Sequence, residues 1–367
     1  MTKPLNILFL CSWYPSRVLP TNGDFIQRHA AAVATQHNVT VFHIITDKNC
    51  TQKIEIVDEV IQNIRTIIAY IKPTSNRFSK ALMFRKAQQK LLEKVTKIDV
   101  VHVNKLFPMG LFALKLKRKF KLPYIISEHH HIYYKPFADA ISYFEKRISI
   151  KITKNAHFVC PVSSDLGQSM QKFGLVGNYK PIGNVIDTIT FKAKNTNEDK
   201  LFTMLHVSNL SAVKNTNGIL NVIAKLKEFI PNFQLNIVGG DTVDINDDTI
   251  KYVGKVSQKE LVNYYQQADV LLLFSHIETF SCVVYESFSC GTPVISTNVG
   301  GIPENFPNDF GILIEPKNEE ALLEAILKIH KTTAKSSEKM HEYVEENFSK
   351  EQICNAFTKL YEKALSV

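Results

Sequence analysis

The chain has 367 residues, a length that suits two domains better than one. No segment approaches the ~20 apolar residues of a membrane span, and the apolar run at 5–11 is too short for a secretory signal. The six cysteines show no Cys-x-x-Cys spacing, which argues against a disulfide framework or a metal cluster and predicts a reduced, cytoplasmic setting.

The net charge of +9 is unevenly distributed. Residues 1–185 hold 27 Lys and Arg against 11 Asp and Glu, whereas residues 186–367 hold 17 against 24. This asymmetry predicts two domains with different partners. Basic runs occur at 115–121 and over 77–97, and the second interleaves cations with Phe78, Leu82, Phe84, Leu91 and Leu92.

The run at 77–97 predicts an amphipathic helix that can lie on an anionic membrane surface. The alternative is that its cations only solvate an outer helix face. No nucleic-acid motif accompanies the basic residues, so we do not expect nucleic acid as a partner.

Strand and helix patterns alternate along the first half of the chain. Strands are predicted at 5–11, 39–45, 99–103, 123–127 and 157–161, and helices at 24–36, 77–97, 108–120 and 136–155. Such alternation predicts a parallel sheet that is covered on both faces. The polar run at 192–200 is the predicted linker.

The alternation restarts after this linker. Strands are predicted at 201–207, 233–238, 269–274 and 294–296, with another ending at Val253, and helices at 215–229, 257–267 and 349–366. The sequence therefore predicts two Rossmann-like α/β domains, residues 1–188 and residues 189–348.

Residues 275–304 read SHIETFSCVVYESFSCGTPVISTNVGGIPE and form a predicted βαβ unit. Such units place ligands at the carboxyl ends of their strands, where helix N-termini attract phosphate. Glu278 and Glu286 are eight residues apart across the predicted helix start. Eight helical residues rise about 12 Å, which is too far for the paired acids of a glycosidase but suits an extended ligand. The alternative is a solvated Glu followed by a carboxylate that interacts with the helix dipole.

A Glu, seven residues and a second Glu in this setting resemble the signature of the retaining GT-B glycosyltransferases of family 4, the glycosyl transferases group 1. The resemblance covers nearly the whole chain and is most specific over 201–304. It implies two Rossmann-like domains facing a cleft, and a helix at 349–367 that crosses back towards the first domain. It also implies that Glu278 contacts the transferred sugar and that Glu286 holds the ribose of the nucleotide.

The same resemblance assigns the donor site. Lys214 matches the family's lysine and is the expected cation for the diphosphate, whereas Asn209 stands where relatives carry an arginine. The alternative for Lys214 is an exposed lysine near a helix start. The backbone of Val253 and Gly254 is expected to contact the base. Amides at the helix start are expected to bind the diphosphate, in the segment Thr279, Phe280, Ser281 and Cys282, where relatives read Gly-Phe-Gly.

A metal is not expected at the donor diphosphate. The one dense acidic cluster follows Gly239-Gly240, and the resemblance places that loop away from the phosphates; its members are Asp241, Asp244, Asp247 and Asp248. Cationic side chains and backbone amides can neutralise a leaving diphosphate instead.

The acceptor side is expected in the first domain. Gly23 and Asp24 lie in a strand-to-helix turn, and His129 resembles the family's histidine near the transferred sugar, with His130 as the alternative in register. His102 and Asn104 follow a neighbouring strand and are expected to line the same cleft. The three adjacent histidines at 129–131 are not expected to bind metal, because neighbouring residues at a strand end point in different directions.

These features predict a retaining glycosyltransferase without a cofactor, cytoplasmic and peripheral to the membrane. Its substrates would be a UDP- or GDP-sugar and a hydroxyl of a lipid-linked or surface-polysaccharide precursor. Two alternatives stay open. One is a nucleotide-sugar hydrolase or epimerase of the same fold. The other is a non-catalytic nucleotide-sugar-binding scaffold, which the missing arginine and the replaced glycines would favour.

Overall fold

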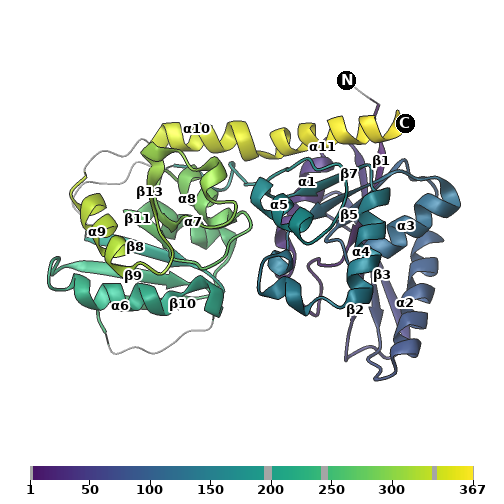
Figure 1. The fold of residues 1–367 in the computed structure, drawn as a ribbon, viewed down its shortest axis with the longest axis horizontal. Helices are drawn as coiled ribbons and strands as arrows, with labels where there is room; N and C mark the ends of the chain where they lie inside the picture. Colours follow the sequence, from purple (N-terminus) through teal and green to yellow (C-terminus); the bar gives the residue numbers. More distant parts are fainter. Residues whose placement is uncertain (1–2, 194–200, 241–246, 333–336, 367) are drawn as a thin grey trace. The chain divides into compact units, whose positions relative to one another are not determined.

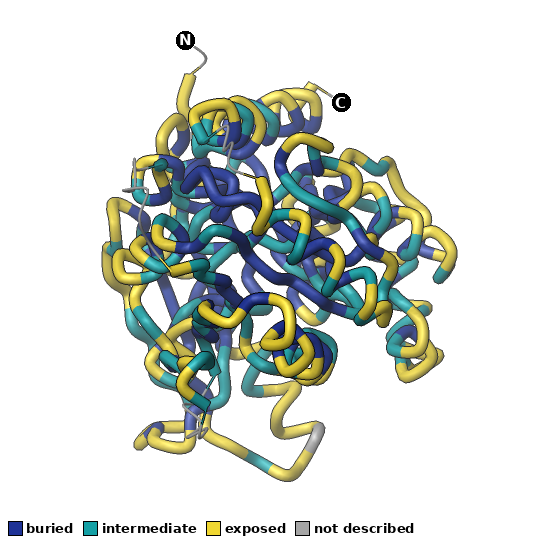
Figure 2. The backbone as a smooth tube through the Cα atoms, turned by 90° about the vertical axis from the view of Figure 1, so that its left-hand side faces the viewer, coloured by how far each residue is buried: buried dark blue, intermediate teal, exposed yellow. Residues whose placement is uncertain are grey.

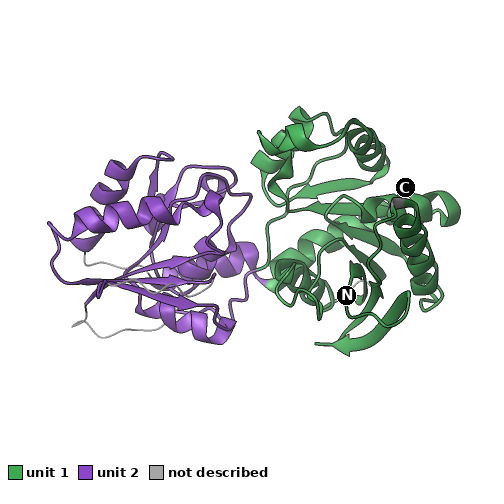
Figure 3. Ribbon diagram, turned by 90° about the horizontal axis from the view of Figure 1, so that it is seen from below, with its two compact units in different colours: residues 1–185, 350–367 green, residues 186–349 purple. Residues whose placement is uncertain are grey.

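The computed structural model describes residues 3–193, 201–240, 247–332 and 337–366. The chain divides into two compact units, which Figure 3 distinguishes by colour. Unit 1 comprises residues 1–185 together with 350–367, and unit 2 comprises residues 186–349. Most of the predicted linker at 192–200 lies outside the described residues.

Unit 1 contains a seven-stranded sheet in the order β3-β4-β2-β1-β5-β6-β7. All neighbouring strands are parallel except β3 and β4, which form an antiparallel hairpin at one edge. The strands are β1 Asn6–Cys11, β2 Asn38–Thr46, β3 Ile54–Ile61, β4 Ile64–Ile71, β5 Val100–Asn104, β6 Tyr124–Glu128 and β7 Phe158–Pro161.

The hairpin is an addition to the strands predicted from the sequence. Its two-residue loop, Gln62 and Asn63, has φ angles of 50° and 65°. Two consecutive left-handed residues are typical of the type I′ turn that joins twisted antiparallel strands.

The helices of unit 1 cover both faces of the sheet. They are α1 Asp24–Val33, α2 Arg77–Leu92, α3 Met109–Phe120, α4 Tyr143–Asn155, α5 Ser164–Lys172 and α11 Lys350–Leu365, with short 3-10 turns η1 His131–Tyr133 and η2 Phe137–Ala140. The last helix, α11, lies beside α1 and contributes Phe357 and Tyr361 to the core that contains β1 (Figure 1). The helix predicted at 136–155 begins later, because Ser142 caps α4 by accepting a hydrogen bond from the amide of Glu145.

Unit 2 contains a six-stranded parallel sheet in the order β10-β9-β8-β11-β12-β13. Its strands are β8 Phe202–Val207, β9 Phe233–Val238, β10 Ile250–Gly254, β11 Val270–Leu273, β12 Val294–Thr297 and β13 Gly311–Ile314. Its helices are α6 Thr216–Leu226, α7 Gln258–Gln267, α8 Cys282–Ser289, α9 Glu319–His330 and α10 Ser337–Phe348, with 3-10 turns η3 Ala212–Lys214, η4 Pro303–Asn305 and η5 Asn308–Phe310.

The predicted α/β fold class is confirmed. Buried residues lie in the interior of the tube in Figure 2, and the strands β5, β11 and β12 are buried along their whole length. Because the strands of each sheet are mainly parallel, the loops after them gather at one edge, where ligands of such folds bind. Among the described residues, no helix combines the length and the apolar character that crossing a bilayer requires.

Candidate active site

In unit 2, Lys214 and Glu278 come together although 64 residues separate them in sequence. The ammonium of Lys214 lies 2.6 Å from Oε1 of Glu278, and the two side chains are 22% and 7% exposed. Lys214 ends η3 after β8, and Glu278 follows β11, the strand beside β8. The amide of His276 donates to the carbonyl of Val213 at 2.7 Å, so the backbone of one loop is fixed to the other.

The Glu278 loop is also held from its other side. The hydroxyl of Thr297, at the end of β12, donates to the carbonyl of Ser275 at 2.6 Å. Gly300 has a φ of 57°, and a Cβ at this position would overlap the carbonyl oxygen of Glu278. A glycine is therefore required here for two reasons, its left-handed backbone and its close approach to this loop.

Helix α8 begins just after Glu278, at Cys282, so the segment 278–281 is not helical. The helical spacing expected between Glu278 and Glu286 was therefore wrong, because one carboxylate is in a loop and the other is inside the helix. Ser281 is the N-cap residue of this helix and has a φ of 64°, but its side chain makes no capping hydrogen bond, and its buried hydroxyl has no hydrogen-bond partner among the described residues. The first turn of the helix therefore has no side-chain cap.

Glu286 lies on α8 and is only 4% exposed. Its Oε2 accepts a hydrogen bond of 3.2 Å from the hydroxyl of Tyr265, which is fully buried on α7. Tyr265 was not predicted as a site residue, since its only signal in the sequence is that of an aromatic residue in a helix. Its hydrogen bond orients the carboxylate that the family resemblance assigns to the ribose.

The other residues of the signature segment differ in exposure. Phe280 is buried and packs against Tyr285 and Phe348, with ring centroids 4.6 and 5.2 Å apart. Its side chain belongs to the core, so a ligand can meet only its backbone. Thr279 and Cys282 are partly exposed.

Asn209 is exposed and turned towards its own loop. Its Oδ1 accepts hydrogen bonds from the amide and the hydroxyl of Ser211, at 3.2 and 2.8 Å. Gly254 accepts from the amide of Gly239 at 2.7 Å, which joins the ends of β10 and β9. Val253 is partly buried on β10.

The acidic loop contains one described ion pair. Asp247 pairs with Lys227 at 2.8 Å. Asp241 and Asp244 lie outside the described residues. Across the described parts of the chain, no three His, Cys, Asp or Glu side chains converge as metal ligands would.

In unit 1, His129 follows β6 and is buried. Its Nδ1 is 3.1 Å from Oδ1 of Asn184, and its Nε2 has no partner among the described residues. Its ring lies 4.7 Å from that of Phe25 and 5.3 Å from that of His29, measured between centroids. Burial lowers the pKa of His129 to about 3, so the ring is neutral at pH 7 and its Nε2 is available for a hydrogen bond.

Glu128, the last residue of β6, organises the segment that carries His129. Its two carboxylate oxygens accept hydrogen bonds of 2.9 Å from the amides of Leu106, His129 and His130. Burial raises the pKa of Glu128, while these amides and the charge of Lys105 oppose that increase. This role was not predicted, although a Glu that ends an apolar strand is a recognisable signal.

His130 lies in an aromatic and cationic setting. Its ring contacts that of Trp13 edge-on, with centroids 4.7 Å apart, and the ammonium of Lys105 lies 3.8 Å from the centroid of a Trp13 ring. Burial and the nearby charge of Lys105 lower the pKa of His130 to about 3. Lys105 and Trp13 were not predicted as site residues.

Two of the remaining residues expected at the acceptor side, His102 and Asn104, are buried in the core of unit 1. His102 is fully buried and bonds to Tyr361 at 2.7 Å and to Ser127 at 2.8 Å, so its side chain lies in the core rather than in the expected cleft lining. Asn104 is also buried, and its Nδ2 donates to the carbonyl of His102 at 3.4 Å.

The turn before α1 contains the other two expected residues. Gly23 has a φ of 78°, and a Cβ there would lie 2.9 Å from the carbonyl carbon of Trp13. Asp24 pairs with Arg28 at 3.1 Å one helical turn later.

Two family models match the chain, Glycosyltransferase Family 4 over residues 25–189 and Glycosyl transferases group 1 over residues 187–347. An uncharacterised 41.2 kDa protein in the cps region of Klebsiella pneumoniae is 28% identical over 288 residues, 73% of this chain and 80% of that protein. The putative teichuronic acid biosynthesis glycosyltransferase TuaC of Bacillus subtilis is 24% identical over 88% of this chain and 89% of its own length.

Among solved structures, HepE of Anabaena in complex with UDP and glucose superposes with a TM-score of 0.75. The match covers 98% of this chain and all of that one at 17% identity, which shows a shared GT-B fold. The two family models together span residues 25–347. The chain therefore belongs to the group 1 glycosyltransferases of family 4, and it is a retaining glycosyltransferase with the GT-B fold.

Proposed function

We propose that unit 2 binds a nucleoside diphosphate sugar through Lys214, Glu278, Glu286 and the N-terminus of α8. The observation that carries the proposal is the close pair formed by Lys214 and Glu278 next to that helix start. A cation and the backbone amides at a helix start suit a diphosphate. Glu286, held by Tyr265, suits a pair of ribose hydroxyls. The UDP in the HepE complex supports the same ligand class.

In the proposed reaction, the bond between the anomeric carbon and the diphosphate oxygen breaks. The acceptor hydroxyl forms its new bond on the same face of the sugar, which keeps the anomeric configuration. The acceptor proton moves to the leaving phosphate. Lys214 and the amides of Ser281 and Cys282 would stabilise the charge that develops on the diphosphate. Glu278 would contact the sugar, and no metal is assigned a role.

We assign the acceptor to unit 1, near His129, His130, Lys105 and Trp13. The neutral Nε2 of His129 can accept a hydrogen bond from a sugar hydroxyl, and the ammonium of Lys105, which lies over the Trp13 ring, can donate one. The class we propose is a lipid-linked or surface-polysaccharide precursor at an anionic membrane surface on the cytoplasmic side. The similarity to TuaC, a putative teichuronic acid biosynthesis glycosyltransferase, and the basic helices of unit 1 support this assignment.

A thermal-shift panel of UDP, GDP, ADP and their sugars on the full chain tests the donor assignment. A ligand at 100 times its Kd should stabilise the chain by about 2.7 kcal/mol. The matched control is Glu286→Gln, which should weaken the shift for nucleotide sugars. No shift with any member of the panel would refute the donor site.

A non-catalytic scaffold remains the second candidate, because Asn209 lacks a charge and bonds to its own loop. Binding of a nucleotide sugar without turnover, whichever lipid or saccharide acceptor is added, would favour that alternative. Release of free sugar without an acceptor would instead favour a hydrolase.

A further inference from the structure

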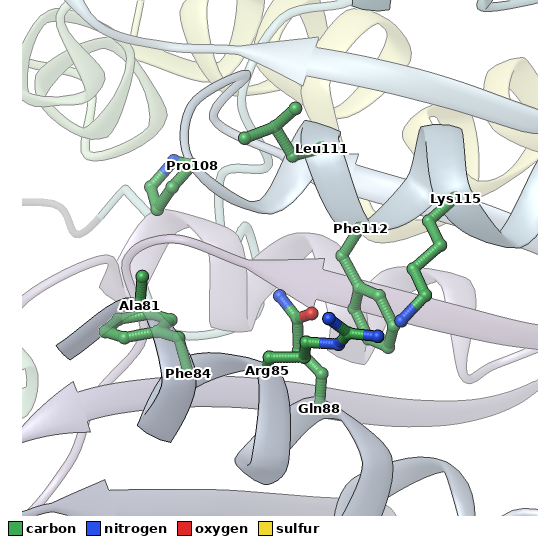
Figure 4. Close-up of a pocket in the computed structure, with 8 residues that line it drawn as sticks. All are labelled: Ala81, Phe84, Arg85, Gln88, Pro108, Leu111, Phe112 and Lys115. Atoms are coloured by element: carbon green, nitrogen blue, oxygen red, sulfur yellow. The ribbon is translucent and has the colours of Figure 1, made fainter. Parts of the chain in front are cut away.

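A cavity of about 490 Å³ lies between α2 and α3 on the surface of unit 1 (Figure 4). The α2 wall uses side chains three and four residues apart, which lie on one helix face: Ala81, Phe84, Arg85 and Gln88. The α3 wall repeats this spacing with Pro108, Leu111, Phe112 and Lys115. One face of α2 and one face of α3 therefore form the two walls of the cavity.

The lining combines an apolar part with a cationic part. Phe84, Leu111 and Phe112 are among the apolar residues of the lining, and the charged groups of Arg85 and Lys115 point toward one another in Figure 4. Neither cation forms an ion pair with any carboxylate of the described residues. Two facing like charges repel each other, and an anion between them would relieve that repulsion. The lining therefore suits an anionic group that is attached to an apolar body.

The charged residues of the helices around the cavity are almost all basic. Helices α2, α3 and α4 together hold thirteen Lys and Arg residues and one carboxylate, Glu145. The net charge of these three helices therefore exceeds the +9 of the whole chain. Helix α4 packs directly beside α3, because a Cβ on Gly110 would lie 2.8 Å from the side chain of Ile152. This surface is complementary to an anionic one.

Exposed apolar side chains stand at the N-terminal ends of both helices, and Phe120 at the C-terminal end of α3 is also 51% exposed. Phe78 and Leu82 of α2 are 87% and 53% exposed, and Leu111 of α3 is 41% exposed. This distribution differs from the amphipathic helix predicted at 77–97, since Leu91 instead packs in the core. Arg85 follows Phe78 by seven residues, or about 10 Å along the helix axis.

That order matches the layers of a bilayer. Apolar side chains at the helix tips can enter the acyl region by 5–10 Å, and cations one to two turns behind them reach the phosphate layer. Both helices start at the carboxyl edge of the sheet, since α2 follows β4 and α3 follows β5. Pro108 lies three residues after Lys105, so the cavity adjoins the proposed acceptor site.

The geometry points to the α2–α3 cavity as the site of an anionic phospholipid of the bilayer. Its acyl chain packs between Phe84 and Leu111, and its phosphate lies between Arg85 and Lys115. This inference deepens the proposed function, and it rests on the proposed lipid-linked acceptor. It places that acceptor's headgroup at Lys105 while unit 1 is held on the membrane.

Co-sedimentation of the full chain with vesicles tests the site. Vesicles of phosphatidylcholine alone are compared with vesicles that also contain phosphatidylglycerol. The variant Arg85→Gln with Lys115→Gln should weaken binding to the anionic vesicles roughly 30-fold. The control, Lys90→Gln with Lys119→Gln, removes the same charge from the same helices. It should change binding little, because neither Lys90 nor Lys119 lines the cavity.

Leu111→Ser tests the apolar contact at an exposed position and should weaken vesicle binding without lowering the Tm. If Arg85→Gln with Lys115→Gln (the pocket variant) and the control lose vesicle binding equally, the binding depends on net charge and not on the cavity. That result would overturn the proposal. Binding of glycerol phosphate with the affinity of vesicles would assign the cations to a soluble phosphate and also overturn it.

Donor binding by the same variants separates the two proposals. UDP-sugar thermal shifts should be unchanged in the pocket variant, because Arg85 and Lys115 are in unit 1. A wild-type chain that binds anionic vesicles but no nucleotide sugar would refute the proposed donor site and leave the lipid site standing.

Discussion

The ammonium of Lys214 and the carboxylate of Glu278 are 2.6 Å apart. Each therefore neutralises the charge of the other. A nucleoside diphosphate sugar would divide this pair, taking the cation to its phosphates and the carboxylate to its sugar. The cation is thus held in place without being exposed as an uncompensated charge.

Lys214→Ala is expected to lower kcat/KM about 10²–10³-fold, because it removes the cation proposed for the leaving diphosphate. It should also lower the free energy of unfolding by roughly 1–3 kcal/mol, since Glu278 remains buried without its partner. Steady-state kinetics and urea unfolding measure the two effects. Lys214→Arg, which keeps the charge, is the control. Full turnover in Lys214→Ala would exclude the proposed role.

Tyr265→Phe removes the hydroxyl that donates to Glu286 at 3.2 Å. We expect a KM for the donor that is roughly fivefold higher and a loss of about 1 kcal/mol in stability, the typical net value of one hydrogen bond. The value of kcat should change less, because the ribose is remote from the reacting bond. Calorimetric titration with UDP gives a direct measurement. Unaltered UDP affinity would show that Tyr265 supports the core alone.

Gly300→Ala should abolish most activity, because the new Cβ would overlap the Glu278 carbonyl and displace that loop. The control is Gly174→Ala. Gly174 also has a left-handed φ, of 103°, but its nearest neighbour would be Cε of Lys146 at 3.6 Å. Both variants carry backbone strain of about 1–3 kcal/mol. Equal activity losses would mean that strain, and not the approach to Glu278, is responsible.

Asn184→Asp places a carboxylate beside Nδ1 of His129 and should raise the pKa of that ring towards its ordinary value. The pH profile of kcat/KM should then acquire a limb between pH 5 and 7 that the wild type lacks. Asn184→Ala, which adds no charge, is the control and should leave the profile's shape unchanged. An unchanged profile in Asn184→Asp would remove His129 from the proposed acceptor site.

Stability should fall as the pH is lowered from about 6.5. His102 and His129 each have a pKa of about 3 in the folded chain, against 6.5 when unfolded, so the unfolded chain binds more protons between these values. Each ring then contributes at most about 1.4 kcal/mol per pH unit to the loss. Glu128 has the opposite effect, because its raised pKa makes the folded chain bind more protons than the unfolded chain above pH 4.5. Its contribution to stability therefore falls as the pH rises.

Urea unfolding at pH 5 and pH 7 measures this dependence. Hydrogen bonds lower the pKa values of Asp47 and Asp58, so these two carboxylates stabilise the folded chain while they are charged. Both keep their charge between pH 5 and pH 7, so they do not contribute to the measured difference. His129→Gln should show a smaller difference between the two pH values. Equal stability of the wild type at pH 5 and pH 7 would contradict the burial of neutral histidines.

The parallel strands could be predicted because each is a short apolar run followed by glycine or polar residues. The β3–β4 hairpin was missed, since the charged Glu55, Asp58 and Glu59 dilute its apolar pattern. Two β-branched runs around Gln62 and Asn63 were an available signal. Strand β13 and helices α5, α9 and α10 were also not predicted.

Within the site, motif residues were easier to identify than the residues that support them. Glu278, Glu286 and Lys214 belong to recognisable segments, whereas Tyr265 acts through a contact between two helices. His102 was expected at the acceptor side because it ends a strand. Its partner Tyr361 comes from the far end of the chain, and no local pattern reveals that contact.

The pairing of His102 with Tyr361 has a consequence for synthesis. Helix α11 supplies Ile353, Phe357 and Tyr361 to the core of unit 1, yet it is the last helix to leave the ribosome. A nascent chain that ends at residue 185 has every strand of the seven-stranded sheet but an open groove beside α1. Unit 1 therefore cannot complete its core during translation until the whole of unit 2 has also emerged from the ribosome.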